Sequence, residues 1–247
     1  MKIRGLVFDI NGTLIDINTN EGMESMYHVL SNFLLYQGIS ISRQLVRDLY
    51  FQIMKEQRRA SGETHPEFDA VGVFREILTR HGSAYTKTLP AERREQLPSI
   101  LAEVFRAASL QRLQLYPGVK EVLDRLRPDY RLSALSDGQN VWAIPELHAV
   151  GLLEYFDPII ISSNLGYRKP DIRIFQQALD GLFLKASEVL FVGNDIYRDI
   201  FGAQQLGLKT VFFKSNQGEQ EKNGVKADYI VYNFPELLKA IKFFEAQ

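Results

Sequence analysis

The sequence of 247 residues has no cysteine, so disulfide bonds, thiolate metal ligands and a cysteine nucleophile are excluded. It also lacks an apolar run of about 18 residues, and the apolar stretch near its start stops after Phe8. We therefore expect no membrane-spanning helix and no signal peptide, and we expect a cytoplasmic protein. The net charge of −1 does not favour nucleic acid or an anionic membrane as a partner. No feature of the sequence indicates an oligomeric state.

Six short runs rich in β-branched and aromatic residues are present, each bounded by Gly, Pro, Asn, Asp or Ser, as buried strands tend to be. They span residues 3–10, 130–136, 157–163, 188–193, 209–213 and 228–232. Amphipathic stretches typical of helices lie at 117–127, 171–183, 197–207 and 235–246. From about residue 113 strands and helices alternate. This pattern predicts an α/β fold with a Rossmann-like parallel sheet and helices on both faces.

Residues 17–112 have a different pattern. They contain long apolar periods of 3.6 residues, and no strand is expected among them. A structureless loop of this length inside a compact domain is implausible. We therefore predict an inserted, all-α subdomain at 17–112, and an α/β core formed by residues 1–16 and 113–247.

Polar residues follow several predicted strands, where open α/β sheets bind their ligands. Asp9, Ser136 and Asp195 stand at strand ends, Lys169 lies in a loop after a strand, and Asp199 follows Asp195 by one helical turn. Each residue alone has an ordinary structural explanation, such as a turn or a helix N-terminus. Their joint occurrence at one edge of a sheet favours a functional site.

These residue types fit phosphoryl transfer. A carboxylate can attack a phosphoryl group and form an aspartyl-phosphate. The negative oxygens of the transferred group need a hydroxyl, a lysine and usually Mg²⁺, and Mg²⁺ prefers carboxylate and other hard oxygen ligands. Asp9 as nucleophile and ligand, Asp195 as ligand, and Ser136 and Lys169 as phosphate anchors would meet this list.

Four segments resemble, in order, the four motifs of the haloacid dehalogenase-like hydrolase superfamily. They are VFDINGTL (7–14), LSALSDG (132–138), YRKPD (167–171) and FVGNDIYRDIFGAQQLG (191–207). The insert at 17–112 resembles the α-helical cap that one branch of the superfamily carries after its first motif. The resemblance implies a Mg²⁺-dependent hydrolase, and most simply a phosphatase of small phosphorylated metabolites.

The resemblance also implies a role for each matching residue. Asp9 would be the nucleophile, and Asn11 would offer its main-chain carbonyl to Mg²⁺ from the position where an aspartate would act as acid and base. Thr13 would orient the loop, and Ser136 and Lys169 would hold the phosphoryl group. Asp195 would bind the metal, and Asp199 the metal or its water. We also expect Asp137, beside Ser136, and Arg58, in the most polar stretch of the insert, to contact the substrate.

Asn11 departs from the phosphatase pattern, because an amide cannot transfer a proton. General acid–base help is typically worth about 10²–10⁴-fold, so a phosphatase with Asn11 would be slow, selective for good leaving groups, or helped by another residue. A 2-haloacid dehalogenase-like hydrolase needs no such acid, but it would leave the acidic pair Asp195 and Asp199 unexplained. A non-catalytic binding protein would explain the amides at 11 and 194. Deamidation of Asn11 before Gly12, or an introduced Asp→Asn replacement, would also account for this position.

Overall fold

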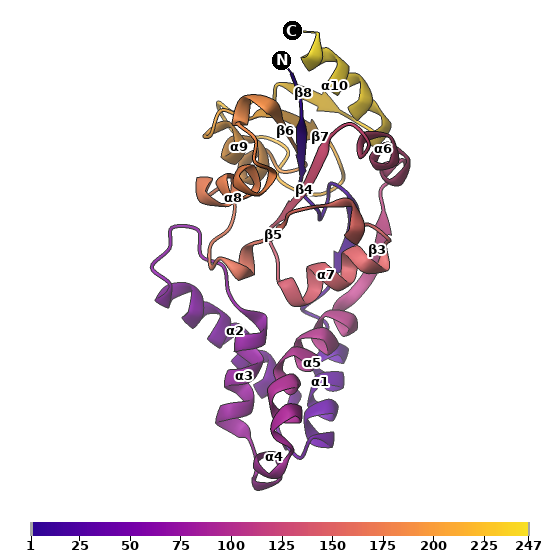
Figure 1. Cartoon of the computed structure of the whole chain (residues 1–247). Coiled ribbons are helices and arrows are strands. Elements are labelled where there is room, and N and C mark those ends of the chain that lie inside the picture. The colour runs from indigo at the N-terminus through magenta and orange to yellow at the C-terminus, as the bar shows by residue number, and fades with distance from the viewer. Residues whose placement is uncertain (1, 247) are drawn as a thin grey trace.

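The computed structural model describes residues 2–246; residues 1 and 247, which belong to the predicted core ranges, lie outside it. A parallel sheet with flanking helices occupies one end of the molecule, and helices α1–α5 form the other end (Figure 1). No helix of the described part is long and apolar enough to cross a membrane.

All six predicted strands are present, and they form one parallel sheet. The order across it is β5 (Ile159–Ile161), β4 (Arg131–Ser136), β1 (Gly5–Phe8), β6 (Val189–Gly193), β7 (Lys209–Phe213) and β8 (Tyr229–Val231). The chain builds the sheet outward from β1 on one side and then crosses back to β6. Ligands of such sheets bind where the order reverses, which here is between β1 and β6. The predicted α/β class is confirmed.

The two faces of the sheet have separate cores, because successive side chains of a strand point to opposite faces. Leu6 and Phe8 lie on one face, which α6 (Val119–Leu126), α7 (Asn140–Ala149) and α10 (Leu237–Glu245) cover. Val7 and Phe191 lie on the other, beneath α8 (Ile172–Leu182) and α9 (Gly202–Gln204) (Figure 1). Short 3₁₀ turns occur at Leu153–Tyr155, Ser162–Asn164, Ala186–Glu188 and Phe234–Glu236, and a π-helical turn at Ile196–Phe201.

The inserted helices have a core of their own, as their apolar periodicity predicts. They are α1 (Glu24–Tyr36), α2 (Arg43–Ala60), α3 (Ala70–His81), α4 (Ala84–Thr88) and α5 (Ala91–Ser109). Tyr50 and Phe105 stack at its centre with ring centroids 4.3 Å apart, and Trp142 of α7 packs into the same cluster. The insert is therefore docked on the sheet part through α7.

Two strands connect the insert to the sheet part. β2 (Ile15–Thr19) and β3 (Leu110–Leu115) pair antiparallel, with Ile17 opposite Leu113. The expectation of no strand within 17–112 is therefore wrong at both ends of that range. These strands are only partly buried and mix polar with apolar residues, so their sequences carry no strong strand signal. The predicted boundaries at 16/17 and 112/113 fall within them.

Candidate active site

A polar cavity of about 580 Å³ lies at the carboxyl end of the sheet. Asp9, Asp137 and Asn194, which follow β1, β4 and β6, line it together with Asn11 and Arg198. The insert and its connecting strands add Asn18, Thr19, Arg106 and Arg112. The structure thus places the cavity at the sheet edge where the sequence predicts a site, and residues of both parts of the chain form its wall.

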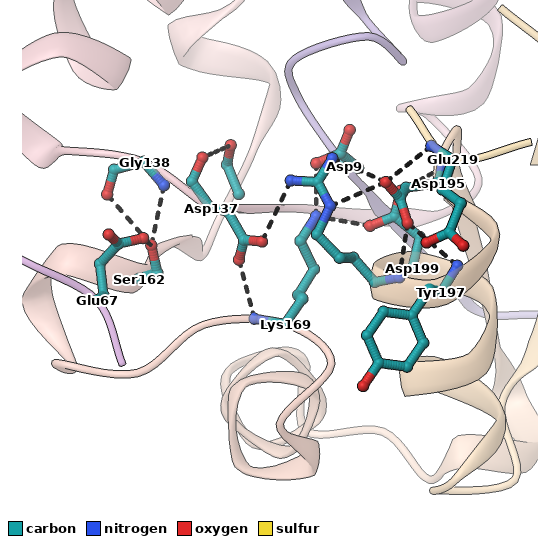
Figure 2. A network of polar contacts seen from close by, with 12 residues as sticks. Asp9, Glu67, Asp137, Gly138, Ser162, Lys169, Asp195, Tyr197, Asp199 and Glu219 are labelled. Carbon is teal, nitrogen blue, oxygen red and sulfur yellow. Dashed lines mark hydrogen bonds and ion pairs between the residues drawn. The ribbon is translucent and has the colours of Figure 1, made fainter. Parts of the chain in front are cut away.

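Lys169 is held between two carboxylates. Its Nζ donates to Asp9 Oδ1 and to Asp199 Oδ1, at 2.6 Å each (Figure 2). Burial alone would lower the pKa of Lys169, but the charges of Asp199 and Asp9 outweigh burial and raise that pKa. The lysine therefore stays charged and forms an ion pair with each of the two carboxylates.

A tight turn orients Asp9 and Asn11. Thr13 Oγ1 lies 2.9 Å from Asp9 Oδ2 and 3.1 Å from Asn194 Oδ1, and it can donate its single proton to one of them at a time. Gly12 has φ of 88°, and a Cβ there would stand 2.3 Å from Asn194 Nδ2. Only glycine fits this position. Asn11 Oδ1 is buried without a hydrogen-bond partner.

Ser136 and Asp137 follow β4. Ser136 is buried, and its hydroxyl lies 3.4 Å from the main-chain oxygen of Asp137. Asp137 Oδ1 accepts the main-chain N–H of Lys169 at 2.9 Å, whereas its Oδ2 has no hydrogen-bond partner. Arg198 Nη1 lies 3.6 Å from that second oxygen. Burial raises the pKa of Asp137, and the charge of Lys169 opposes the rise.

Asp195 and Asp199 have all their oxygens engaged. Asp195 Oδ1 accepts the N–H groups of Tyr197 and Arg198, and its Oδ2 accepts Arg198 Nε and the N–H of Glu219. Burial alone would raise the pKa of Asp195, but these donors outweigh burial and lower it. Asp199 Oδ2 accepts the N–H groups of Asn194 and Asp195, at 3.0 Å each. Both residues hold the turn after β6 in place.

The comparison with known families agrees with this geometry. A model of haloacid dehalogenase-like hydrolases matches residues 3–207. The chain belongs to the haloacid dehalogenase-like hydrolases. The superfamily resemblance of the four motifs is therefore confirmed, and the protein is a hydrolase of this family.

Relatives and solved structures support the same assignment. A glyceraldehyde 3-phosphate phosphatase of Pyrococcus furiosus is 25% identical over 98% of this chain and 94% of its own. An N-acylneuraminate-9-phosphatase of Rattus norvegicus is 25% identical over 97% of this chain and 95% of its own. The crystal structure of a 2-haloacid dehalogenase from Pseudomonas syringae pv. Tomato DC3000 has a TM-score of 0.69 at 19% identity, covering 98% of this chain and 99% of the other. That likeness shows the fold.

In this haloacid dehalogenase-like site, the ligands of a metal ion would come from the residues of the cavity wall. Among residues 2–246, no group of three acidic or histidine side chains is arranged to hold a metal ion. The oxygens of Asp195 and Asp199 already accept hydrogen bonds from the protein, so the role of these residues as metal ligands stays a prediction. Asp9, Asn11 and Asn194 do line the cavity, and the side-chain oxygen of Asn194 lies 3.1 Å from Thr13 Oγ1. One carboxylate with neutral oxygens and substrate phosphate fits Mg²⁺. Asn194, the first residue after β6, is therefore a candidate ligand that the sequence analysis did not name.

The arginines of the site differ from expectation. Arg58 lies outside the described cavity lining, 3.7 Å from Glu67 and over the ring of Phe68. Three other arginines, Arg198, Arg106 and Arg112, line the cavity although the sequence analysis did not name them. Arg198 follows Asp195 by three residues, a spacing that brings side chains together on a helical turn. The position of Arg106, on the last turn of a helix in the insert, has no sequence signal.

Proposed function

We propose that the protein is a Mg²⁺-dependent phosphatase of small phosphorylated metabolites. The observation that carries the proposal is the carboxylate of Asp9, held at the cavity wall by Lys169 and Thr13. The phosphatase names of full-length relatives such as that of Pyrococcus furiosus support it. The helices α1–α5 would act as a cap that closes the far side of the cavity.

Asp9 would attack the phosphorus and form an aspartyl-phosphate, which water then hydrolyses. Lys169 would balance the charge between Asp9 and the phosphoryl oxygens, and the hydroxyl of Ser136 would donate to one of those oxygens. Mg²⁺, held by Asp9, Asn194 and the main-chain carbonyl of Asn11, would add positive charge at the phosphoryl group. The cavity would exclude most of the bulk water while the phosphoryl group is transferred.

The far end of the cavity fits an uncharged, hydroxylated leaving group. Its arginines already have carboxylate partners: Arg106 Nε lies 2.5 Å from Glu146 and Arg112 Nε lies 2.9 Å from Asp16. Amides and hydroxyls fill much of the remaining wall, namely Asn18, Thr19, Gln139, Asn216 and Gln217. Such a wall would bind a sugar or short polyol phosphate, which agrees with the name of the Pyrococcus furiosus relative.

Hydrolysis of 2-haloacids is the second candidate. The full engagement of the Asp195 and Asp199 oxygens by protein donors favours it, because it weakens the case for a metal. The two reactions give different products from different substrates. Release of halide from a 2-haloacid without Mg²⁺ would support this candidate, and release of phosphate would support the first.

The deciding experiment is hydrolysis of p-nitrophenyl phosphate by the wild type and by Asp9→Asn, with Mg²⁺ and with a chelator. We expect Mg²⁺-dependent hydrolysis by the wild type and a loss of at least about 10³-fold in Asp9→Asn, since the nucleophile is removed. Asp124→Asn, the same change at an exposed position of α6, should retain activity. Hydrolysis that survives Asp9→Asn would overturn the assignment of the nucleophile, and an inactive wild type would favour a binding protein.

A further inference from the structure

The cavity contains a buried carboxyl group whose function is not yet explained. The side chain of Asp137 is 8% exposed and lines the cavity with Asp9 and Asn11. One of its oxygens has no hydrogen-bond partner. A buried polar atom left without a partner destabilises the folded protein. Such an atom on the wall of an active-site cavity indicates a ligand or a reacting group on the other side.

The surroundings of Asp137 fix its position. Its Oδ1 accepts the main-chain N–H of Lys169 at 2.9 Å, while the ammonium of the same lysine contacts Asp9 at 2.6 Å (Figure 2). On the other side, the N–H of Gly138 donates to Ser162 Oγ at 2.9 Å. These contacts hold Asp137 on the cavity wall that also includes Asp9. Its second oxygen accepts no hydrogen bond, and Arg198 Nη1 lies 3.6 Å from it, so a substrate atom that meets this oxygen would lie beside Arg198.

We propose that Asp137 is the general acid and base of the phosphatase reaction, in place of the amide at position 11. The inference rests on the proposed function. It assigns to Asp137 the proton transfer that Asn11 cannot perform, and it places the leaving oxygen of the substrate at the unpartnered carboxyl oxygen.

The proton balance closes over two steps. In the first, Asp9 forms a bond to phosphorus, the bond from phosphorus to the leaving oxygen breaks, and Asp137 gives its proton to that oxygen, releasing an alcohol. In the second, water attacks the phosphorus of the aspartyl-phosphate and the bond to Asp9 breaks. Asp137 takes a proton from that water, phosphate leaves, and both carboxyl groups return to their starting states.

The charged groups around Asp137 act in opposite directions on its proton. Burial raises its pKa and Asp199 raises it further, while Lys169 and Arg198 lower it. The charge of Asp137 in turn contributes to raising the pKa of Glu67, on the insert. The net shift is upward, so a larger fraction of Asp137 is protonated at a given pH than for an exposed aspartate. The first step needs the acid form, so its rate should fall as the pH rises through this pKa.

The test compares two leaving groups. Glycerol 2-phosphate expels an alkoxide that needs a proton, whereas p-nitrophenyl phosphate expels a stable phenolate. Asp137→Asn keeps the acceptor for the N–H of Lys169 and removes the acid, together with the charge opposite Arg198. We expect kcat/KM to fall about 10²–10⁴-fold with glycerol 2-phosphate and less than about tenfold with p-nitrophenyl phosphate. A purely structural role would lower both alike, and equal losses would overturn the proposal.

A second variant tests whether an acid at position 11 can replace the acid at position 137. Asn11→Asp should raise the hydrolysis of glycerol 2-phosphate at least about tenfold more in the Asp137→Asn background than in the wild type, because only the former lacks an acid. Equal gains in both backgrounds would contradict the proposal.

The wild type alone provides a check if Asp137→Asn does not fold. Its pH profile should show an alkaline fall with glycerol 2-phosphate that is absent with p-nitrophenyl phosphate, and matching profiles would count against Asp137. A wild type that hydrolyses neither ester would instead refute the proposed function.

Discussion

Lys169 is the residue whose charge the site depends on most. Lys169→Met would leave Asp9 and Asp199 buried, adjacent and without their shared cation. Removing one partner of a buried ion pair typically costs 3–5 kcal/mol, because a buried charge is left uncompensated. We expect the free energy of unfolding in urea to fall by about that amount, and phosphatase activity to be lost.

Lys209→Met is the matched control for this change. Lys209 Nζ lies 2.6 Å from Asp228, as close as Lys169 is to its partners, but its side chain is 47% exposed. An exposed pair is worth about 0–1 kcal/mol, so this variant should lose little stability. Similar losses in the two variants would show that burial does not set the cost at Lys169.

The sequence predicts the role of a site residue when its contacts are with residues nearby in the chain. Asp9 and Thr13 are four residues apart on one turn, and the structure joins them at 2.9 Å. The engagement of Asp195 was not predictable, because one of its donors is the N–H of Glu219, in a loop 24 residues further along the chain. A sequence motif indicates which carboxylates are near a site, but the donors that compete for them come from the tertiary structure.

At the scale of elements, those whose buried residues form one simple pattern were predictable. The six sheet strands lie between two cores, and their apolar runs show it. Helix α7 did not stand out, because it packs on two partners. Its Ala143 and Leu147 face the sheet while Trp142 faces the inserted helices, and Pro145 stands inside it. Its apolar residues therefore form no single stripe.

One connection between elements ties the insert to the site. The loop between α2 and α3 contacts the segment before Lys169: the N–H of Glu67 donates to the carbonyl of Gly166, and the N–H of Arg168 donates to the carbonyl of His65. Ser162 Oγ donates to Glu67 at 2.8 Å and accepts the N–H of Gly138 (Figure 2). Hydrogen bonds thus link the insert to the loop that carries Asp137, so a movement of the insert would displace that loop.

Ser162→Ala should loosen this connection. It leaves the carboxylate of Glu67 and the N–H of Gly138 without their partner in a buried place, which costs about 1–3 kcal/mol. We expect a lower unfolding midpoint in urea and a lower kcat. In the neighbouring Ser163→Ala, only the exposed N–H of Asn140 loses its partner, so both quantities should change less. A larger effect at Ser163 would contradict this role of Ser162.

At the scale of the whole molecule, the insert and the sheet part unfold together only if the interface between them is stable. Trp142, the single tryptophan, lies in that interface. Its Nε1 donates to the carbonyl of Ala102 in α5 at 2.8 Å. Arg106 of α5 pairs with Glu146 of α7, and their side chains are 15% and 7% exposed. We therefore expect the wild type to unfold in a single transition.

Arg106→Met, Glu146→Met and the double variant measure how strongly this pair joins the two parts. Each single change leaves a mostly buried charge unpaired and should cost about 3–5 kcal/mol, while the double variant should recover most of the loss. In the wild type, Trp142 emission and far-UV circular dichroism should report the same urea midpoint. In the single variants emission should change first, because the insert detaches from α7 before the sheet unfolds. Effects of the two single changes that add within about 0.5 kcal/mol would show that the pair is not coupled, and the junction would then depend on Trp142 and the loop at Glu67.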